Sequence, residues 1–223
     1  MRLRERAVGT QRTPSRVVAL LLVASWLAAG CLGNSPDPRF YTLTALATTA
    51  EVDVDAEPLG IGVGPIHLPR YLQRPQIVTR RGDHRLDYHE LHRWGGSLAS
   101  ETLRALGANL SVLLATDRVA VYPLQGGFPV KYRVRMDVEQ FDGERGGEVQ
   151  LRVRWLIAPA DGGDALAVGY SNLREDVGSS RYEDLVRAHS ELLSTLSREI
   201  AERIRELEEA EIASQQRDAD PDG

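Results

Sequence analysis

Four side chains that could bind a metal lie close together in one short stretch of the sequence. They are His84, Asp87, His89 and His92. Residues 89–92, HELH, look like a shortened form of a helical zinc motif in which two histidines lie four residues apart. Here the two histidines are three residues apart, and the glycine-containing stretch 81–84 between two strand-like segments predicts a hairpin. We therefore expect exposed hairpin histidines rather than a metal site.

No other group of residues in the sequence predicts catalysis. Residues 60–64, GIGVG, invite a dinucleotide-binding interpretation, but the spacing is not G-x-G-x-x-G and Pro65 stands where a helix would have to begin. No G-x-S-x-G motif is present. The acidic residues Asp53, Asp55 and Glu57 lie in a stretch that is typical of a solvated loop. We therefore predict a protein that is not an enzyme and needs no cofactor.

The N-terminal residues have the pattern of a secretory signal. Residues 1–16 carry five arginines and one glutamate, and residues 17–29 are an uncharged apolar run. A helix of this length spans about 20 Å, which is shorter than the ~30 Å hydrocarbon core of a bilayer. A permanent transmembrane helix is therefore the weaker interpretation, and we predict that residues 1–30 are removed as a signal peptide.

The only cysteine, Cys31, stands where cleavage should occur. Residues 27–31, LAAGC, resemble a bacterial lipobox, in which the chain is cut between Gly30 and Cys31 and the cysteine becomes acylated. The alternative is a secreted protein with an incidental thiol, but a free thiol is a liability in an oxidising compartment. Leu32 follows, and aspartate at that position is the usual inner-membrane retention signal in enterobacteria. The resemblance thus favours an outer-membrane lipoprotein that faces the periplasm.

The composition of the rest of the chain indicates one water-soluble domain. Residues 31–223 carry 22 basic and 31 acidic side chains, a net charge of −9. This acidic balance argues against nucleic acid as a partner, because nucleic acid is bound by basic surfaces. No other apolar run in the sequence approaches membrane length. We expect a tether over residues 31–39, a domain over residues 40–212 and a disordered polar tail over residues 213–223.

Polarity patterns predict the main elements of this domain. Apolar and charged residues alternate over residues 130–141 and again over 149–157, and a third strand follows over 165–177, which together form an antiparallel meander. A turn is expected to begin at Asp142. Leucines recur at helical spacing from the N-cap Ser97 to about residue 115, and a longer helix over 182–210 has an apolar stripe that includes His189. With shorter strands elsewhere, we expect an α/β (α+β) fold with roughly seven strands and two long helices.

One amphipathic segment has the residue types of a partner-binding surface. Residues 69–80, PRYLQRPQIVTR, hold two stiffening prolines together with tyrosine and arginine, which are favoured at interfaces. Trp94 follows just before the first long helix. The alternative for Tyr71 and Trp94 is packing in the core. The residues that we expect to contact a partner are Pro69, Tyr71, Leu72, Arg74, Pro75, Gln76 and Trp94.

At these residues the chain resembles the ABC-type transport auxiliary lipoproteins, the family of PqiC- and YmbA-like proteins. The shared features are the lipobox cysteine, residues 40–43 (FYTL), residues 61–65 (IGVGP) running into 68–78 (LPRYLQRPQIV), Trp94 before a helix, and residues 149–155 after FDG. The resemblance implies a single compact domain with a mixed, largely antiparallel sheet covered by two long helices.

The resemblance also implies a function. It implies a non-enzymatic component of an MCE-type lipid transport system that supports membrane integrity and docks the MCE-domain protein that bridges the periplasm. An inner-membrane permease and its ATPase would be engaged indirectly. The alternative is a lipoprotein that itself carries a lipid or another small ligand, for which a deep apolar pocket is the expected mark.

Overall fold

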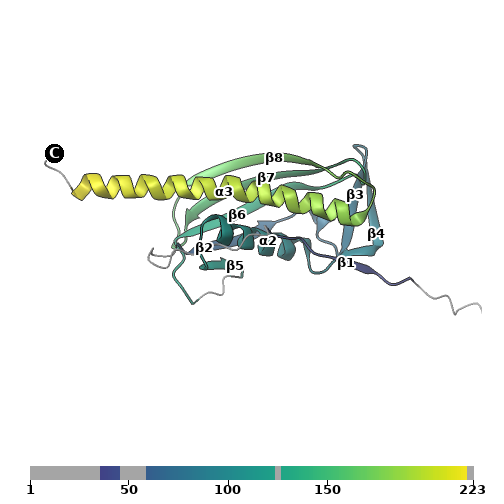
Figure 1. Ribbon diagram of the computed structural model, residues 1–223, viewed down its shortest axis with the longest axis horizontal. Helices are drawn as coiled ribbons and strands as arrows, with labels where there is room; N and C mark the ends of the chain where they lie inside the picture. The colour runs from purple at the N-terminus through teal and green to yellow at the C-terminus, as the bar shows by residue number, and fades with distance from the viewer. Residues whose placement is uncertain (1–35, 46–58, 124–126, 220–223) are drawn as a thin grey trace, which may run out of the picture. The chain divides into compact units, whose positions relative to one another are not determined.

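Eight strands form one mixed sheet in the part of the chain that the computed structural model describes, which is residues 36–45, 59–123 and 127–219 (Figure 1). The strands are β1 (Arg39–Tyr41), β2 (Ile61–His67), β3 (Gln76–Arg81), β4 (Arg85–Trp94), β5 (Val119–Val121), β6 (Tyr132–Gly143), β7 (Glu148–Pro159) and β8 (Ala167–Asp176). The helices are α2 (Leu98–Leu113) and α3 (Tyr182–Ala219), and a single 3-10 turn, η2, covers Arg70–Leu72. The predicted signal peptide, its cleavage site and Cys31 lie outside the described residues.

Strand β6 organises the sheet because it pairs with three other strands. Its whole length pairs with β7 in antiparallel register, from Tyr132 opposite Pro159 to Gly143 opposite Val149. Along its other edge it pairs in parallel first with β2 and then, at Gly143, with Thr79 of β3. The connection between β2 and β3 therefore runs beside β6, where η2 lies.

The remaining pairings extend the sheet to three outer strands among the described residues, one of which is β5, paired in parallel with β2. Strand β8 pairs only with β7, and β1 pairs only with β4, which in turn forms an antiparallel hairpin with β3. The antiparallel ladders are the long ones, and the parallel pairings are shorter. The predicted meander of three strands and the predicted mixed sheet are confirmed.

Both helices cover the same face of the sheet and pack against each other (Figure 1). Ser97 caps α2 by accepting the N–H of Ser100 at 3.0 Å. The amide of Asn109 in α2 donates to Ser197 Oγ of α3 at 3.0 Å, so a buried polar contact fixes the helix pair. The core lies between this pair and the inward side chains of the strands. Among the described helices, none combines the length and the apolar character that a membrane span requires.

The C-terminal helix is longer than the sequence analysis predicted. It continues to Ala219, so the helix predicted over residues 182–210 is too short, and the assignment of residues 213–219 to a disordered tail is wrong. The end of α3 extends beyond the strands (Figure 1). Lys131 pairs with Glu208 at 2.6 Å and with Glu211 at 2.9 Å, which holds the first part of this extension. The rest, residues 212–219, includes two alanines and two glutamines, which favour helix even without tertiary packing.

Candidate functional site

The segment between β2 and β3 folds into a stiff turn. Pro69 precedes η2, and its carbonyl accepts the N–H of Leu72 at 2.9 Å. The Gln73 side chain donates to the carbonyl of Leu68 at 2.7 Å, which closes the turn from the other side. Leu72 inserts into the core and is 3% exposed. The sequence between two prolines is thus held by its own hydrogen bonds and by one buried leucine.

A buried carboxylate fastens this turn to the sheet. Asp142, at the end of β6, is fully buried, and its oxygens accept from Tyr71 Oη at 2.5 Å and from Arg80 Nε at 2.7 Å. Gln140 Nε2 donates a further hydrogen bond at 3.1 Å. A buried charge costs little only when it is paired and hydrogen-bonded, and here both conditions hold. Burial, together with the hydrogen bond to Asp142, raises the pKa of Tyr71, so its hydroxyl remains a donor at physiological pH.

A shallow groove opens between this turn and the start of α2. It holds about 330 Å³ and is lined mainly by apolar atoms. The lining residues are Leu68, Leu72, Gln73, Arg74 and Pro75 from the turn, and Gly96, Ser97, Leu98 and Ala99 from the start of α2. The network around Asp142 holds the turn that forms one wall of the groove, so the wall is pre-organised.

Arg74 gives the groove a charged rim. Its side chain is exposed, and its guanidinium lies 4.7 Å from the ring centroid of Tyr88. Among the described residues no carboxylate forms an ion pair with it. A guanidinium stacked on an aromatic ring has its orientation restricted while its planar donors remain available to a carboxylate or carbonyl.

The residues that were predicted to contact a partner differ in their exposure and in their contacts. Arg74 and Pro75 are exposed on the groove, Pro69 is half-buried, and Gln76 is half-buried and donates to the carboxylate of Glu90. Tyr71 is half-buried, and its hydroxyl donates a hydrogen bond to the carboxylate of Asp142.

Leu72 and Trp94 are both buried. Trp94 is 4% exposed and packs edge-on against the ring of His189, with 5.6 Å between ring centroids. Leu72 is also buried, below the turn. Trp94 does not line the groove, so its packing fits the core alternative, whereas Leu72 is buried and also lines the floor of the groove. The reason for the burial of Trp94 is the pleat of β4, which directs this residue toward α3.

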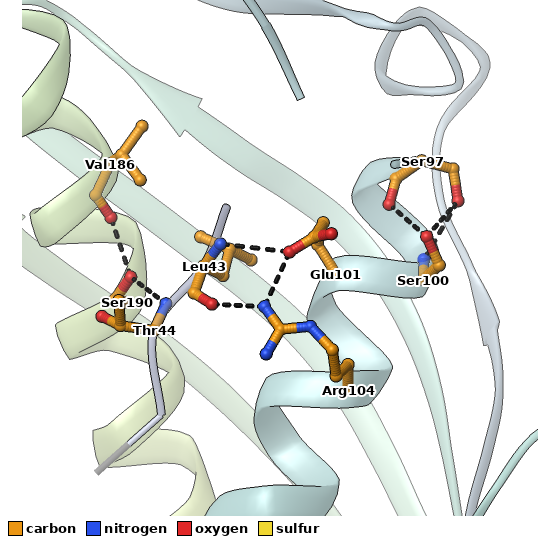
Figure 2. A network of polar contacts seen from close by, with 8 residues as sticks. All are labelled: Leu43, Thr44, Ser97, Ser100, Glu101, Arg104, Val186 and Ser190. Atoms are coloured by element: carbon orange, nitrogen blue, oxygen red, sulfur yellow. Dashed lines mark hydrogen bonds and ion pairs between the residues drawn. The ribbon is translucent and has the colours of Figure 1, made fainter. Parts of the chain in front are cut away.

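The residues that follow strand β1, Leu43 and Thr44, are hydrogen-bonded to both helices (Figure 2). Glu101 of α2 accepts the backbone N–H of Leu43 at 3.2 Å and pairs with Arg104, which donates to the carbonyl of Leu43. Ser190 of α3 accepts the N–H of Thr44 at 3.1 Å and donates to the carbonyl of Val186. Leu43 itself is 1% exposed. These residues form a clamp that binds the N-terminal segment to the domain core.

Two of the hairpin histidines, His89 and His92, are half-buried against Tyr182 at the start of α3 instead of being exposed. The ring of His92 stacks on that of Tyr182 with centroids 3.5 Å apart, and its Nδ1 lies 2.8 Å from Tyr41 Oη. His89 Nε2 lies 2.7 Å from Thr79 Oγ1. Only His84 is exposed as predicted. In the described part of the chain, no three His, Cys, Asp or Glu side chains converge as a metal site would require.

The sequence analysis missed the residues that position the site. It placed Asp142 in a turn, and it assigned no role to Arg104 or Ser190. The signal available for Asp142 was its position directly after Phe141 at the end of an alternating strand, where a charged side chain can still face inward. No local pattern links Leu43 to Glu101, because these residues meet only in the folded chain.

Comparison with known proteins identifies the fold and the family. Residues 41–201 match the family model described as ABC-type transport auxiliary lipoprotein component. No curated protein matches the sequence. A crystal structure described only as that of an uncharacterized protein aligns with a TM-score of 0.62 at 20% identity, covering 76% of this chain and 99% of the other. A protein of the DUF330 family from Xanthomonas campestris aligns with a TM-score of 0.58 at 13% identity, covering 73% of this chain and 92% of its own.

These two structural likenesses, at low identity, concern the fold alone. The family match runs from β1 into α3 and includes the clamp, the turn, the groove and Asp142. The chain therefore belongs to the family of ABC-type transport auxiliary lipoprotein components.

Proposed function

We propose that the chain is a non-enzymatic lipoprotein of the outer membrane that faces the periplasm and docks the MCE-domain protein of a lipid transport system, in support of membrane integrity. Cys31 carries the lipid after cleavage at Gly30. The inner-membrane permease and its ATPase are engaged through the MCE protein and not directly. Membership of an auxiliary transport family supports the link to an ABC-type system, and the likeness of residues 61–78 to PqiC-like proteins suggests the MCE partner.

The groove beside the turn is the observation that carries this proposal. It is apolar, its wall is fixed by the contact between Tyr71 and Asp142, and Arg74 stands at its rim. A rigid apolar depression with one oriented charge suits an inserted apolar side chain next to a carboxylate or carbonyl of a partner. Because the wall is pre-organised, little conformational entropy is lost when the partner binds.

The position of the groove also supports docking close to the membrane. Gly95, which precedes the groove residue Gly96, donates its N–H to the carbonyl of Tyr41 at 2.7 Å. The groove therefore lies beside the strand that follows the tether. A partner bound there contacts the domain close to the strand to which the tether is joined in sequence.

The alternative, a lipoprotein that carries lipid itself, has weaker support. The apolar hollows formed by described residues hold about 330 and 340 Å³ and are open to solvent. Binding sites that enclose a ligand bury most of its surface in a deep cleft. An open groove beside a charged rim fits a protein side chain better than an acyl chain.

Copurification with the MCE-domain protein of the same transport system tests the proposal. We expect Ala99→Gln, which fills the groove, to reduce copurification about tenfold or more, as loss of an interface anchor does. The matched control is Val168→Gln on β8, at the opposite edge of the sheet, where an apolar side chain that is more exposed than Ala99 is replaced by the same residue. Equal copurification of both variants and of the unchanged chain would contradict docking through the groove. Recovery of bound lipid with the chain, lost in Ala99→Gln, would favour the carrier alternative.

A further inference from the structure

An exposed aromatic surface lies where the tether joins the domain. Phe40 is 63% exposed, and Tyr88 and Leu91 of the neighbouring strand β4 are each 39% exposed. Together with Arg74 and Arg93 these residues form what we call the tether-side patch. Large apolar side chains grouped on a surface in this way mark a contact with another molecule or with a membrane.

The patch lies largely on the face of the sheet that the helices leave uncovered. Tyr41 and His92 contact Tyr182 of α3, so they point toward the helices. Side chains alternate along a strand, so Phe40 and Arg93, which are paired in register between β1 and β4, point the other way. The described elements that pack on the sheet therefore leave Phe40 uncovered.

Arginines give the patch a positive character. The Nε of Arg93 donates to the carbonyl of Glu90 at 2.8 Å, and Arg74 lies over the ring of Tyr88. The acidic neighbour of these two arginines is Glu90, whose carboxylate lies 3.5 Å from Nη2 of Arg93. Two arginines, Arg74 and Arg93, therefore lie with one carboxylate, Glu90, on this surface, although residues 31–223 carry a net charge of −9. Aromatic rings flanked by arginines are typical of surfaces that sit in the headgroup region of a bilayer.

The length of the tether limits how far the patch can lie from the membrane. Arg39 is eight residues from Cys31, and a chain of that length reaches at most about 27 Å when fully extended. Phe40 is the next residue. Any lipid on Cys31 that is inserted in a bilayer therefore holds the patch within reach of the headgroups, and anionic lipids there attract arginine by about 1 kcal/mol per residue.

We infer that the tether-side patch lies on the phospholipid headgroups of the membrane that holds the lipid of Cys31, with Phe40 inserted and Arg74 and Arg93 beside anionic phosphates. The inference rests on the lipid anchor of the proposed function. It adds a second contact to that anchor and so fixes the orientation of the domain. With the patch on the membrane, the groove beside it opens close to the bilayer surface.

Fluorescence quenching in vesicles tests the inference. The lipidated mature protein is reconstituted in vesicles of phosphatidylethanolamine and phosphatidylglycerol that contain brominated acyl chains, with tryptophan introduced by Phe40→Trp. Both side chains are large and aromatic, and Phe40 is mostly exposed, so the fold should be retained. The matched control is Val168→Trp at the far edge of the sheet, which is 65% exposed. The buried Trp94 and Trp155 give the same background in both variants.

We expect the added fluorescence of Phe40→Trp to fall about twofold with brominated lipid, whereas that of Val168→Trp stays unchanged. Vesicle-bound protein with an unquenched Phe40→Trp would overturn the inference and leave the lipid anchor intact. Protein that does not sediment with vesicles at all would overturn the anchor, and the inference with it. Equal quenching after phosphatidylglycerol is replaced by phosphatidylcholine would overturn the role given to the two arginines.

Discussion

The hydroxyl of Tyr71 donates a 2.5 Å hydrogen bond to the carboxylate of Asp142, across 71 positions of sequence. This contact joins the turn after β2 to the end of β6, and with Arg80 it neutralises a charge that is fully buried. The tyrosine of the proline-bounded segment is therefore a support for the groove wall. Arg74, three residues later, is an exposed residue of the same segment.

Comparing Tyr71→Phe with Arg74→Ala should distinguish a residue that stabilises the turn from a residue that is free to contact a partner. Loss of the hydroxyl removes one donor from Asp142, and we expect unfolding free energy to fall by about 1–2 kcal/mol. Arg74→Ala should leave unfolding free energy within about 0.5 kcal/mol of the original, because its side chain is exposed. Urea unfolding of the two variants measures the difference. An unchanged midpoint for Tyr71→Phe would remove Tyr71 from the supporting role.

The clamp around Leu43 should control how firmly the N-terminal segment is held. Glu101→Ala leaves the N–H of Leu43 without its buried acceptor, at a cost of about 1–3 kcal/mol. We expect faster hydrogen exchange at Leu43 and Thr44, with the middle of β6 unchanged. Ser100→Ala is the control, because Ser100 bonds only to Ser97 within the start of α2 (Figure 2). If Glu101→Ala leaves exchange at these two amides unaltered, then the clamp does not hold the segment.

Stability should decrease in mild acid because of the buried histidines. Burial lowers the pKa of His189, and also of His89 and His92, below the ordinary value of 6.5. The unfolded chain then binds more protons than the folded chain as the pH falls below about 6.5, so stability that is present above that pH is lost below it. Thermal midpoints measured from pH 7.5 to pH 5 should fall. His92→Phe, which keeps an aromatic ring against Tyr182, should reduce the slope, whereas His84→Ala should not. A flat profile in the unchanged chain would contradict the burial of these rings.

The extension of α3 should contribute to stability only through its first part. Residues 215–218 are exposed, so removing residues 213–223 should leave the thermal midpoint unchanged. Removing residues 208–223 also deletes the partners of Lys131, and the hydroxyl of Tyr132 loses Glu211. We expect this second truncation to lower the midpoint by several degrees. Circular dichroism during heating measures both, and equal midpoints would show that the ion pairs at Lys131 add nothing.

The sequence predicted the elements whose pattern is local. The alternation from Tyr132 to Val138 placed β6 and its inward face correctly, because an exposed face and a buried face leave a period of two. The N-cap at Ser97 was also predictable, since capping needs only the first turn. The end of α3 could not be predicted, because residues 213–219 have no apolar stripe. A solvent-exposed helix and a disordered chain share that pattern.

The site was less predictable because its contacts are long-range. The proline-bounded turn could be located from Pro69 and Pro75, yet nothing near Tyr71 shows that Asp142 lies opposite. Trp94 precedes two glycines and a helix, which is equally typical of an exposed corner and of a buried one. Its burial depends on His189 of α3, 95 residues later, and only the packing of α3 on the sheet brings the two together.

Site-specific photocrosslinking in cells tests the docking role most directly. A photoreactive phenylalanine analogue is placed at Ala99 in the groove and, as a control, at Val168 on β8, in the full-length lipoprotein expressed with its transport system. The account predicts a crosslink from position 99 to the MCE-domain protein and none from position 168. A crosslink from position 168 alone, or none from either position while both variants remain folded and membrane-bound, would contradict it.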